Sequence, residues 1–302
     1  MGTIDKILVT GATGFLGSQI LQKLLSAGYT PLVLIRPTSN IWRIKSIISQ
    51  CEVFTLDKDG ENIKELFDLH SITSIIHTAT EYGREKPLSA LLKTNVIFPI
   101  QLIEYGLNKD LKLFINADTF FAKPQFEQDY LNQYTDSKRI LEGLLKGLSA
   151  LVAIRNVRLE HIFGENDSES KFVTAILNKL MRNEAEILLT DGSQKRDFVY
   201  IEDAAEAFVQ ILQNANHSNG YLEFQVGRGE SISVRSFVEE MASLTGSKST
   251  LKFGAMQNRI GEISDSFADL SELTKIGWKP RYDVSSAITN MITLTKQVKN
   301  EY

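Results

Sequence analysis

The sequence lacks the features that mark secreted, membrane-spanning and nucleic-acid-binding proteins. Its single cysteine, Cys51, cannot form a disulfide within the chain, so we expect a reducing compartment such as the cytoplasm. No apolar run approaches the roughly 18 residues of a membrane helix, and residues 1–6 show no charged leader followed by apolar residues, so we expect neither a membrane span nor an export signal. The formal net charge of −4 gives no electrostatic reason to expect nucleic-acid binding.

Repeats and low-complexity stretches are also missing, and what remains is an alternation of apolar strands with amphipathic helices. The chain has 302 residues, of which 43% are hydrophobic, which is enough for a full sheet core and a smaller second lobe. Strands are predicted at 7–9, 31–36, 53–57, 74–80, 112–116 and 152–159, and helices at 18–27, 88–107 and 134–148. This order predicts an α/β fold with a doubly wound parallel sheet of the Rossmann type, in which ligands bind where the strands end.

A glycine-rich turn joins the first predicted strand to the first helix. Its glycines follow the spacing G-x-x-G-x-x-G. Gly11 can take the tight turn, Gly14 lets the backbone approach phosphates, and Gly17 lets the helix pack closely on the strand, with the helix N-terminus facing the anion. The turn therefore predicts a site for the pyrophosphate of a dinucleotide, and its contacts are expected from Gly11, Thr13, Gly14, Phe15, Leu16 and Gly17.

The second predicted strand lacks a carboxylate at its end, where the 2′-hydroxyl of an NAD ribose would need an acceptor. Arg36 stands there instead, followed by the polar residues 38–40. Because a guanidinium pairs with phosphate, this arrangement favours NADP over NAD. The ends of later predicted strands offer further cofactor contacts, at Asp57, Thr78, Ala79 and Thr80.

The chemistry is expected just past the predicted strand that ends at Asn116. Thr119 is the first hydroxyl there, and Tyr134 and Lys138 stand four residues apart at the start of a predicted helix, so they share one face. A lysine charge about 4 Å from the phenol should lower its pKa by up to roughly three units at an effective dielectric near 20. Tyr134 is therefore predicted to transfer a proton while Thr119 holds the substrate oxygen. Two other tyrosines, at positions 82 and 105, also precede a lysine by four residues, but in segments broken by glycine.

The glycine turn, Thr119 and the Tyr134–Lys138 pair together resemble the extended short-chain dehydrogenase/reductase family, and the likeness covers nearly the whole chain. The resemblance implies a Rossmann domain over about residues 1–160 and a smaller lobe for a nucleotide-diphosphate sugar over about 161–302, with about 198–227 returning to the main sheet. It also implies that Tyr134 and Lys138 contact the nicotinamide ribose. A homodimer formed through helices 88–107 and 134–148 is implied as well.

A second signature, over residues 188–203, looks like the sugar-nucleotide branch of this family. The resemblance implies that Arg196 in this signature and Arg259 in the later Arg-Ile-Gly-Glu segment grip the diphosphate, because paired guanidinium forks supply both charge and geometry. His161 stands where many relatives have an asparagine against the diphosphate. Tyr82, Thr119 and Lys171 complete the expected substrate-binding residues, and no metal site is expected.

Within that branch, three segments resemble the corresponding segments of one group of enzymes: residues 36–44, 114–121 and 158–164. These enzymes use NADPH to reduce the C-4 ketone of CDP-4-keto-3,6-dideoxyhexoses, in the synthesis of the O-antigen sugars abequose and paratose. The Asp-Glu pair that dehydratases carry after the active-site threonine is missing, because Phe120 and Phe121 stand there, so elimination of water is not expected. The resemblance thus implies an NADP-dependent 4-ketoreductase. A 4-epimerase that keeps NAD bound is the alternative, and an NADP-binding regulator without activity is a third interpretation. The nucleobase, the configuration at C-4 and the state of C-3 stay open.

Overall fold

A seven-stranded sheet with the strand order β11-β6-β5-β4-β1-β2-β3 forms the centre of the first part of the chain. The computed structural model describes residues 6–58, 60–83, 86–126, 131–215 and 217–300. The sheet strands are β1 (Lys6–Thr10), β2 (Leu32–Ile35), β3 (Glu52–Thr55), β4 (Ile72–His77), β5 (Leu113–Thr119), β6 (Ala153–Leu159) and β11 (Gly220–Val226). The pairs β1–β2, β1–β4, β2–β3 and β4–β5 run parallel, and the order reverses between β1 and β4. The predicted doubly wound α/β fold is therefore confirmed.

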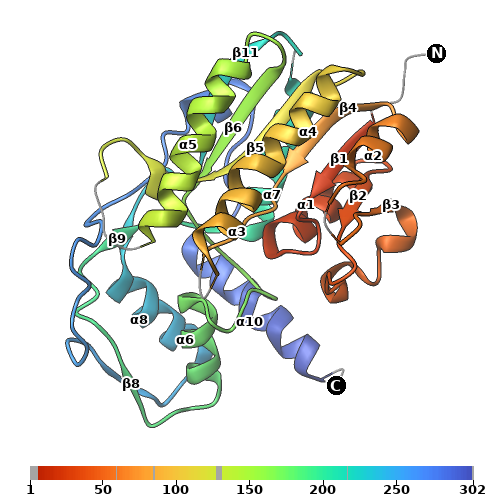
Figure 1. Ribbon diagram of the computed structural model, residues 1–302. Coiled ribbons are helices and arrows are strands. Elements are labelled where there is room, and N and C mark those ends of the chain that lie inside the picture. The colour runs from red at the N-terminus through yellow and green to blue at the C-terminus, as the bar shows by residue number, and fades with distance from the viewer. Residues whose placement is uncertain (1–5, 59, 84–85, 127–130, 216, 301–302) are drawn as a thin grey trace. The chain divides into compact units, whose positions relative to one another are not determined.

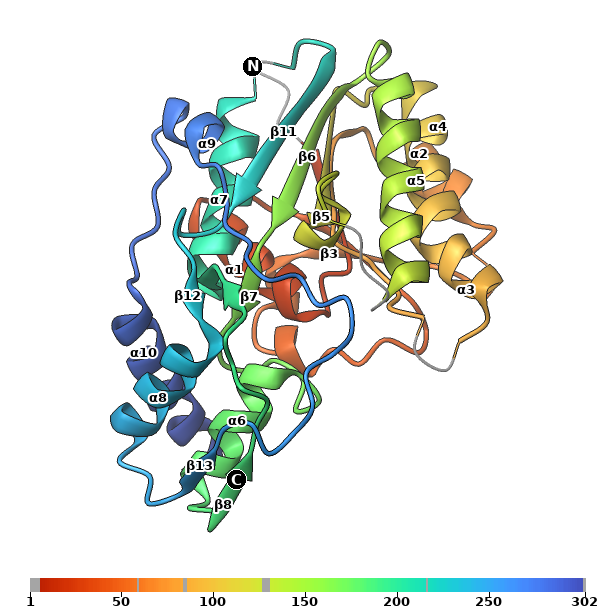
Figure 2. The same ribbon diagram turned by 90° about the vertical axis from the view of Figure 1, so that its left-hand side faces the viewer.

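Helices cover both faces of this sheet (Figure 1 and Figure 2). On one side of the strands lie α2 (Ile63–Leu69), α3 (Leu88–Leu92), α4 (Phe98–Leu107) and α5 (Asn132–Leu148), and on the other lie α1 (Phe15–Ser26) and most of α7 (Ile201–Asn214). All residues of β4 and β5 are buried, because helices shield both faces of these strands. The core beneath α2, α4 and α5 is apolar and includes Leu66, Leu102 and Leu141.

The helix predicted over 88–107 is three consecutive segments rather than one regular α-helix. Between α3 and α4 the residues Lys93–Ile97 form a π-helical segment. Pro99, at the start of α4, has no N–H to donate to the carbonyl of Asn95, so the regular ladder cannot continue through this point. The irregularity places the side chain of Asn95 in the protein interior, where it is 1% exposed.

Strand β5 is longer than the sequence predicts. The prediction ended the strand at Asn116, whereas the structure continues it to Thr119, so this prediction was wrong by three residues. The polar residues Asn116 and Asp118 fit the longer strand because both are buried and hydrogen-bonded to Asn156 on the neighbouring strand β6. Thr119 therefore ends the strand itself, and its Oγ1 accepts a hydrogen bond from the N–H of Phe121 at 3.3 Å.

The chain divides into two compact units. The first runs to Lys123 and adds Leu131–Arg158 and Ala205–Phe224, and the second consists mainly of Leu159–Ala204 and Gln225–Tyr302. The segment that returns to the first unit is thus shorter than the expected 198–227. In the second unit, short strands pair as β7 (His161–Phe163) with β10 (Phe198–Tyr200), β8 (Glu186–Leu188) with β13 (Thr250–Lys252), and β9 (Lys195–Arg196) with β12 (Ile232–Ser233).

The helices of the second unit pack around α8 (Val234–Thr245), which contacts both α6 (Phe172–Met181) and α10 (Val284–Asn300). These three helices lie together in Figure 1, and α9 (Ser271–Lys275) is a single short turn. In the first unit, the remaining short helices are η1 (Trp42–Ile44), η2 (Ile48–Gln50) and η4 (Phe120–Ala122).

No helix in the described part of the chain combines the length and the apolarity needed to cross a membrane. The expectation that no export leader is present concerned mainly residues 1–5, which lie outside the described residues. Cys51 carries a free, half-buried thiol at the start of β3.

Candidate functional site

The glycine turn after β1 is packed too tightly for a side chain at two of its glycines. Gly11 has a φ of +70°, and a Cβ there would lie 2.5 Å from the backbone N of Ala79. A Cβ on Gly17 would lie 2.2 Å from the carbonyl O of Gly11. At Gly14 a Cβ would meet only the Gly11 carbonyl, at 3.1 Å, so one side of the turn is open. Helix α1 begins at Phe15 with no acidic residue in its first turn, so the turn fits the pyrophosphate of a dinucleotide.

The other predicted contacts around this turn lie beside or beneath it. The hydroxyl of Thr78 donates to the carbonyl O of Thr10 at 2.8 Å and packs against the turn, because a Cβ on Gly17 would fall 2.8 Å from its Oγ1. Leu16 is buried in the first turn of α1. The structure therefore brings the predicted contacts of the glycine turn and the end of β4 into one region of the first unit.

Asn95 is a site residue that the sequence analysis missed. Its Oδ1 accepts a hydrogen bond from the N–H of Glu81 at 2.7 Å, and the hydroxyl of Thr80 donates to the same atom at 3.3 Å. Its Nδ2 donates to the carbonyl O of Glu81 at 2.8 Å and to Oγ of Ser137 on α5 at 2.9 Å. One buried amide thus ties the loop after β4 to the helix that carries Tyr134. Its partners are distant in sequence, so no local pattern could have indicated this role.

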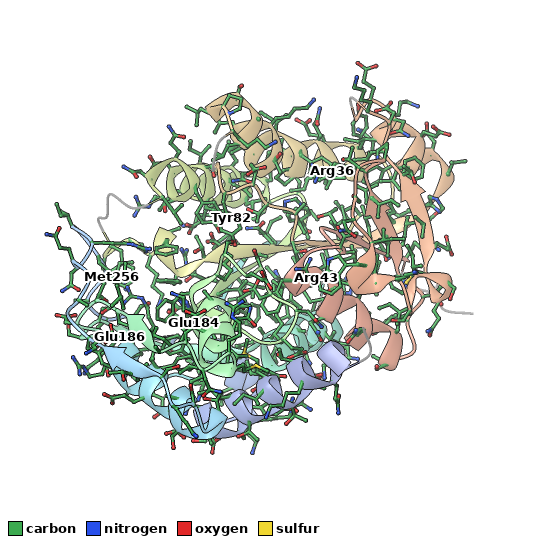
Figure 3. All side chains as sticks on the ribbon, turned by 90° about the horizontal axis from the view of Figure 1, so that it is seen from below. Arg36, Arg43, Tyr82, Glu184, Glu186 and Met256 are labelled. Atoms are coloured by element: carbon green, nitrogen blue, oxygen red, sulfur yellow. The ribbon has the colours of Figure 1, made fainter. Side chains whose placement is uncertain are left out.

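Arg36 lies exposed just past the end of β2, where the sequence analysis placed a group for the 2′-phosphate of NADP. The structure adds Arg43, on η1, whose Nη1 lies 3.4 Å from the carbonyl O of Thr13 in the glycine turn. The guanidinium of Arg43 also stacks on the ring of Trp42, with its Cζ 4.4 Å from the ring centroid. Figure 3 shows Arg36 and Arg43 on the red-to-orange part of the ribbon. Arg43 was missed because its approach to the turn depends on the path of the chain after β2.

Asp57 follows β3, as predicted, but its carboxylate is engaged within its own loop. Its oxygens accept hydrogen bonds from the N–H groups of Glu61 at 2.8 Å and Asn62 at 3.1 Å. The side chain of Asn62 bonds back to the N–H of Asp57 at 2.9 Å. This exchange shapes the loop between β3 and α2, and a cofactor contact from Asp57 stays a prediction.

Tyr134, Lys138 and Thr119 lie together in the first unit, and all three are buried. Tyr134 and Lys138 stand on one face of α5, and Nζ of Lys138 donates to the carbonyl O of Ala117 in β5 at 2.8 Å. The ring of Tyr82, which is 37% exposed, stacks on that of Tyr134 with 4.9 Å between centroids and 29° between planes. The structure thus groups four of the predicted site residues around the end of β5 and the start of α5.

The predicted lowering of the pKa of the Tyr134 phenol is wrong in direction. Burial raises the pKa of Tyr134 well above its ordinary value, and the charges of Tyr82 and Asp118 raise it further, while hydrogen bonds with Thr119 and Thr80 lower it. Burial also lowers the pKa of Lys138, against the attraction of Asp118. That prediction rested on one pair of charges, whereas the loss of solvent around the phenol dominates its pKa in the folded chain.

The second unit brings the predicted diphosphate-binding residues within electrostatic reach of one another. Burial, followed by the positive charges of Arg196 and Lys171, lowers the pKa of His161 to about 3, and Arg259 acts on Arg196 as a like charge. The ring of His161 meets Phe198 edge to face, with 5.2 Å between centroids. Positive side chains and a neutral imidazole thus lie within reach of one another, and the negative charges of Glu262, Glu160 and Asp265 also act on Arg196.

Arg196 is less available than the sequence suggests. Only 5% of it is exposed, and its Nη1 donates to the carbonyl O of Lys195 at 2.7 Å and to that of Ile263 at 2.6 Å. Its Nη2 pairs with Oε1 of Glu262 at 3.1 Å. Most of the guanidinium group of Arg196 therefore binds Glu262 and Ile263. A direct contact between Arg196 and a diphosphate stays a prediction.

A family model, curated relatives and solved structures all resemble this chain over most of its length. The NAD dependent epimerase/dehydratase family matches residues 7–227. The CDP-abequose synthase of Salmonella muenchen is 33% identical over 96% of this chain and 97% of that protein, and that of Salmonella typhimurium is 30% identical over 95% and 97%. Among solved structures, a UDP-glucose 4-epimerase from Thermotoga maritima with UDP-glucose has a TM-score of 0.83 and 20% identity, and the match covers 97% of this chain and 99% of that one.

Proposed function

Because the chain belongs to the NAD dependent epimerase/dehydratase family, we propose that it reduces the C-4 ketone of a nucleotide-linked 4-keto-deoxyhexose with NADPH. The observation that carries this proposal is the burial of Tyr134, which raises the pKa of its phenol and keeps it protonated. A ketone needs such a proton donor as negative charge develops on its oxygen. The similarity to CDP-abequose synthases over almost their whole length supports a CDP-linked deoxysugar as the substrate.

The cofactor is NADP, held by the glycine turn and by two arginines. The turn from Gly11 to Gly17 would hold the pyrophosphate, and Arg36 would pair with the 2′-phosphate. The position of Arg43 beside the Thr13 carbonyl supports a second positive charge at the same end of the cofactor. When bound, the nicotinamide supplies the hydride.

The residues of the first unit would act on the carbonyl in separate roles. Thr119 would donate a hydrogen bond to the carbonyl oxygen and hold it in place. Tyr134 would give its proton to that oxygen as negative charge develops there. Lys138 uses one of its three N–H donors on Ala117, and the others would hold the nicotinamide ribose beside the phenol.

The residues of the second unit would bind the sugar nucleotide. His161, Lys171, Arg196 and Arg259 place positive charge and hydrogen-bond donors together, as a diphosphate requires. Tyr82, in the first unit, offers a partly exposed aromatic ring for the sugar. Arg259 would contact the diphosphate beside Arg196, part of whose guanidinium is engaged with Ile263 and Glu262.

Reduction is favoured over dehydration by the two residues that follow Thr119. Phe120 and Phe121 stack on each other with 4.2 Å between ring centroids and 28° between planes. Neither ring can donate or accept the protons that elimination of water requires. This pair supports a reductase that meets a sugar already lacking the hydroxyl.

The direct test is to mix the purified protein with a CDP-4-keto-3,6-dideoxyhexose and either NADPH or NADH. We expect NADPH absorbance to fall in proportion to the reduced CDP-sugar identified by mass. NADH should support a rate at least about tenfold lower, because it has no 2′-phosphate to pair with Arg36. Absence of NADPH oxidation with every keto sugar nucleotide offered would contradict the proposed function.

A 4-epimerase is the second candidate, favoured by the fold it shares with the Thermotoga maritima enzyme. An epimerase would convert a UDP-sugar to its C-4 epimer without added cofactor and would carry NAD through purification. Incubation with UDP-glucose and analysis of the sugars released by hydrolysis distinguishes the two. Formation of galactose, with no consumption of NADPH by a keto sugar, would replace the reductase proposal.

We also propose that the protein is a homodimer that associates through α3, α4 and α5. Four large apolar side chains on α3, on the π-helical segment between α3 and α4, and on α5 are about half exposed: Leu88 at 47%, Ile97 at 50%, Ile140 at 49% and Leu144 at 45%. Sedimentation of the wild type should give a dimer, and Ile140→Lys should shift it toward the monomer. Leu69→Lys, at an exposed position on α2, is the matched control and should leave the dimer intact. A wild type that sediments as a monomer would refute this association.

A further inference from the structure

A buried carboxylate lies directly before Thr119. Asp118 is 3% exposed, and its Oδ2 accepts a hydrogen bond from Nδ2 of Asn156 at 2.8 Å and lies 3.3 Å from Nη1 of Arg158. Oδ1 of Asn156 in turn accepts from Nδ2 of Asn116 at 2.8 Å. Two side chains of β6 thus hold the carboxylate, which stands on the neighbouring strand β5. Burial raises the pKa of Asp118, while the donors Arg158 and Asn156 favour its ionised form.

The guanidinium of Arg158 does not neutralise this region by itself. Its Nη2 is shared by Oε2 of Glu142 at 3.1 Å and Oε2 of Glu223 at 2.6 Å. Three carboxylates therefore surround one buried guanidinium, and Lys146 pairs with one of them, because its Nζ lies 2.7 Å from Oε1 of Glu142. Of the three acids, Asp118 has the most buried side chain, with 1% of it exposed.

Asp118 also faces the Tyr134–Lys138 pair. Lys138 donates to the carbonyl O of Ala117, which belongs to the peptide bond that leads into Asp118. The carboxylate acts to raise the pKa of Lys138 and that of Tyr134, whereas burial alone lowers the pKa of the lysine.

Charged and titratable groups face this cluster from four elements. They are Tyr134, Lys138, Glu142 and Lys146 on α5, Arg158 on β6, Tyr221 and Glu223 on β11, and His77 on β4. His77 has a pKa of about 3, so it is neutral in the working range. The positive charges here are those of Lys138, Arg158 and Lys146, whose Nζ lies 2.7 Å from Oε1 of Glu142. Removing Asp118 would leave Arg158 still paired with two acids.

We propose that Asp118 is a positioning residue whose fixed negative charge keeps the Tyr134–Lys138 pair protonated, and so extends ketone reduction to alkaline pH. The inference rests on the proposed function, because reduction requires the phenolic proton and the ammonium together. Asp118 acts through the pair, since Thr119 and Tyr134, rather than Asp118, are placed to contact the substrate.

The test compares the pH dependence of kcat/KM for ketone reduction in three variants. Asp118→Asn keeps the size and the bond from Asn156 but removes the charge, and its basic midpoint should lie at least about one pH unit below that of the wild type. Asp118→Glu restores the charge and should restore the midpoint. Glu142→Gln removes a charge from the same arginine, but Lys146 already pairs with that acid at 2.7 Å, so this variant should shift the midpoint much less than Asp118→Asn.

Two further measurements separate the possible failures. If the wild type reduces no keto sugar nucleotide, the proposed function fails. In that case the ionisation of Tyr134 is followed directly, by the ultraviolet absorbance of tyrosinate as the pH is raised. For the wild type and for each variant, the curve of the same protein carrying Tyr134→Phe is subtracted, so that the difference reports Tyr134 alone. Equal midpoints in wild type and Asp118→Asn, or midpoints that move equally in Glu142→Gln, would overturn the role of Asp118. Asp118→Ser is the reserve variant, and if neither neutral variant folds, Asp118 is a structural residue and the inference is wrong.

Discussion

The two units place their candidate residues by different means. In the first unit, Thr119 and Tyr134 stand at the end of a buried strand and the start of a long helix, so regular backbone hydrogen bonds fix their positions. In the second unit, the candidate residues lie on loops and very short strands. Buried acids hold those loops: Asp197 accepts hydrogen bonds from the N–H groups of Arg228, Gly229 and Ala268, at 2.7, 2.9 and 3.1 Å.

A second acid acts in the same way, since both carboxylate oxygens of Glu160 accept from the hydroxyl of Ser266, at 3.0 and 2.8 Å. In a sheet, many backbone hydrogen bonds together hold a side chain in position, so no single one is essential. Where a buried carboxylate holds a loop, the position depends on that one residue. The geometry of the second unit should therefore be lost through single acids, and that of the first unit should withstand single changes outside the reacting groups.

The largest expected effect tests the chemistry of the first unit. Tyr134→Phe removes the phenolic proton and should lower turnover by about 10²–10⁴-fold, because a positioned acid contributes that much to a rate. Binding of NADPH, measured by calorimetry, should be unchanged. Tyr105→Phe, at the other helical tyrosine that precedes a lysine by four residues, is the control and should retain wild-type turnover. Turnover of Tyr134→Phe within about threefold of the wild type would remove this residue from the mechanism.

The next effect tests whether the loops of the second unit depend on one buried acid. Asp197→Ala leaves three N–H groups, that of Ala268 buried and the other two partly buried, without their acceptor and should lower the free energy of unfolding by about 2–4 kcal/mol. Urea denaturation measures the change. Glu239→Ala, at an exposed acid on α8, should stay within about 0.5 kcal/mol of the wild type. Equal stabilities of the two variants would show that the loops of the second unit do not depend on Asp197.

A smaller effect is expected on the preference for NADPH over NADH. It tests whether residues outside the sheet also determine cofactor binding in the first unit. Replacing both Arg36 and Arg43 with alanine should weaken NADPH binding by about tenfold to a hundredfold, because two charge-assisted contacts with the 2′-phosphate are lost. NADH binding should change little. Lys45→Ala, an exposed cation on the same segment, is the matched control. If the affinities for NADPH and NADH fall equally, the two arginines do not contact the 2′-phosphate.

The smallest effect compares one histidine from each unit. His77 has a pKa lowered from 6.5 to about 3 by burial, so the unfolded chain binds more protons in that range and the free energy of unfolding falls as the pH is lowered through it. His77→Gln should reduce the slope by about 1.4 kcal/mol per pH unit. His161→Gln should reduce it by a similar amount, because the pKa of His161 is also lowered to about 3. Denaturation at several pH values measures both, and a slope that stays unchanged in either variant would show that its histidine keeps an ordinary pKa.

The sequence predicted the first unit well because its signals are local. A glycine turn, a strand-end hydroxyl and a Tyr-x-x-x-Lys helix each lie within a few residues, and sheet topology brings them together. Asn95 and Arg43 could not be predicted, since their partners depend on a π-helical segment and on the path after β2. The raised pKa of Tyr134 and the engagement of Arg196 with Ile263 depend on burial, which only the folded chain determines.

The stacking of Arg43 on Trp42 gives the protein an internal optical sensor. Trp42 is 47% exposed, and its stacking partner touches the glycine turn, whereas Trp278, the other tryptophan, is 4% exposed in the second unit. Any anion that draws Arg43 away from the indole changes the surroundings of one fluorophore and leaves the other as an internal reference. Intrinsic fluorescence therefore offers a label-free record of occupancy at the first unit, without substrate or turnover.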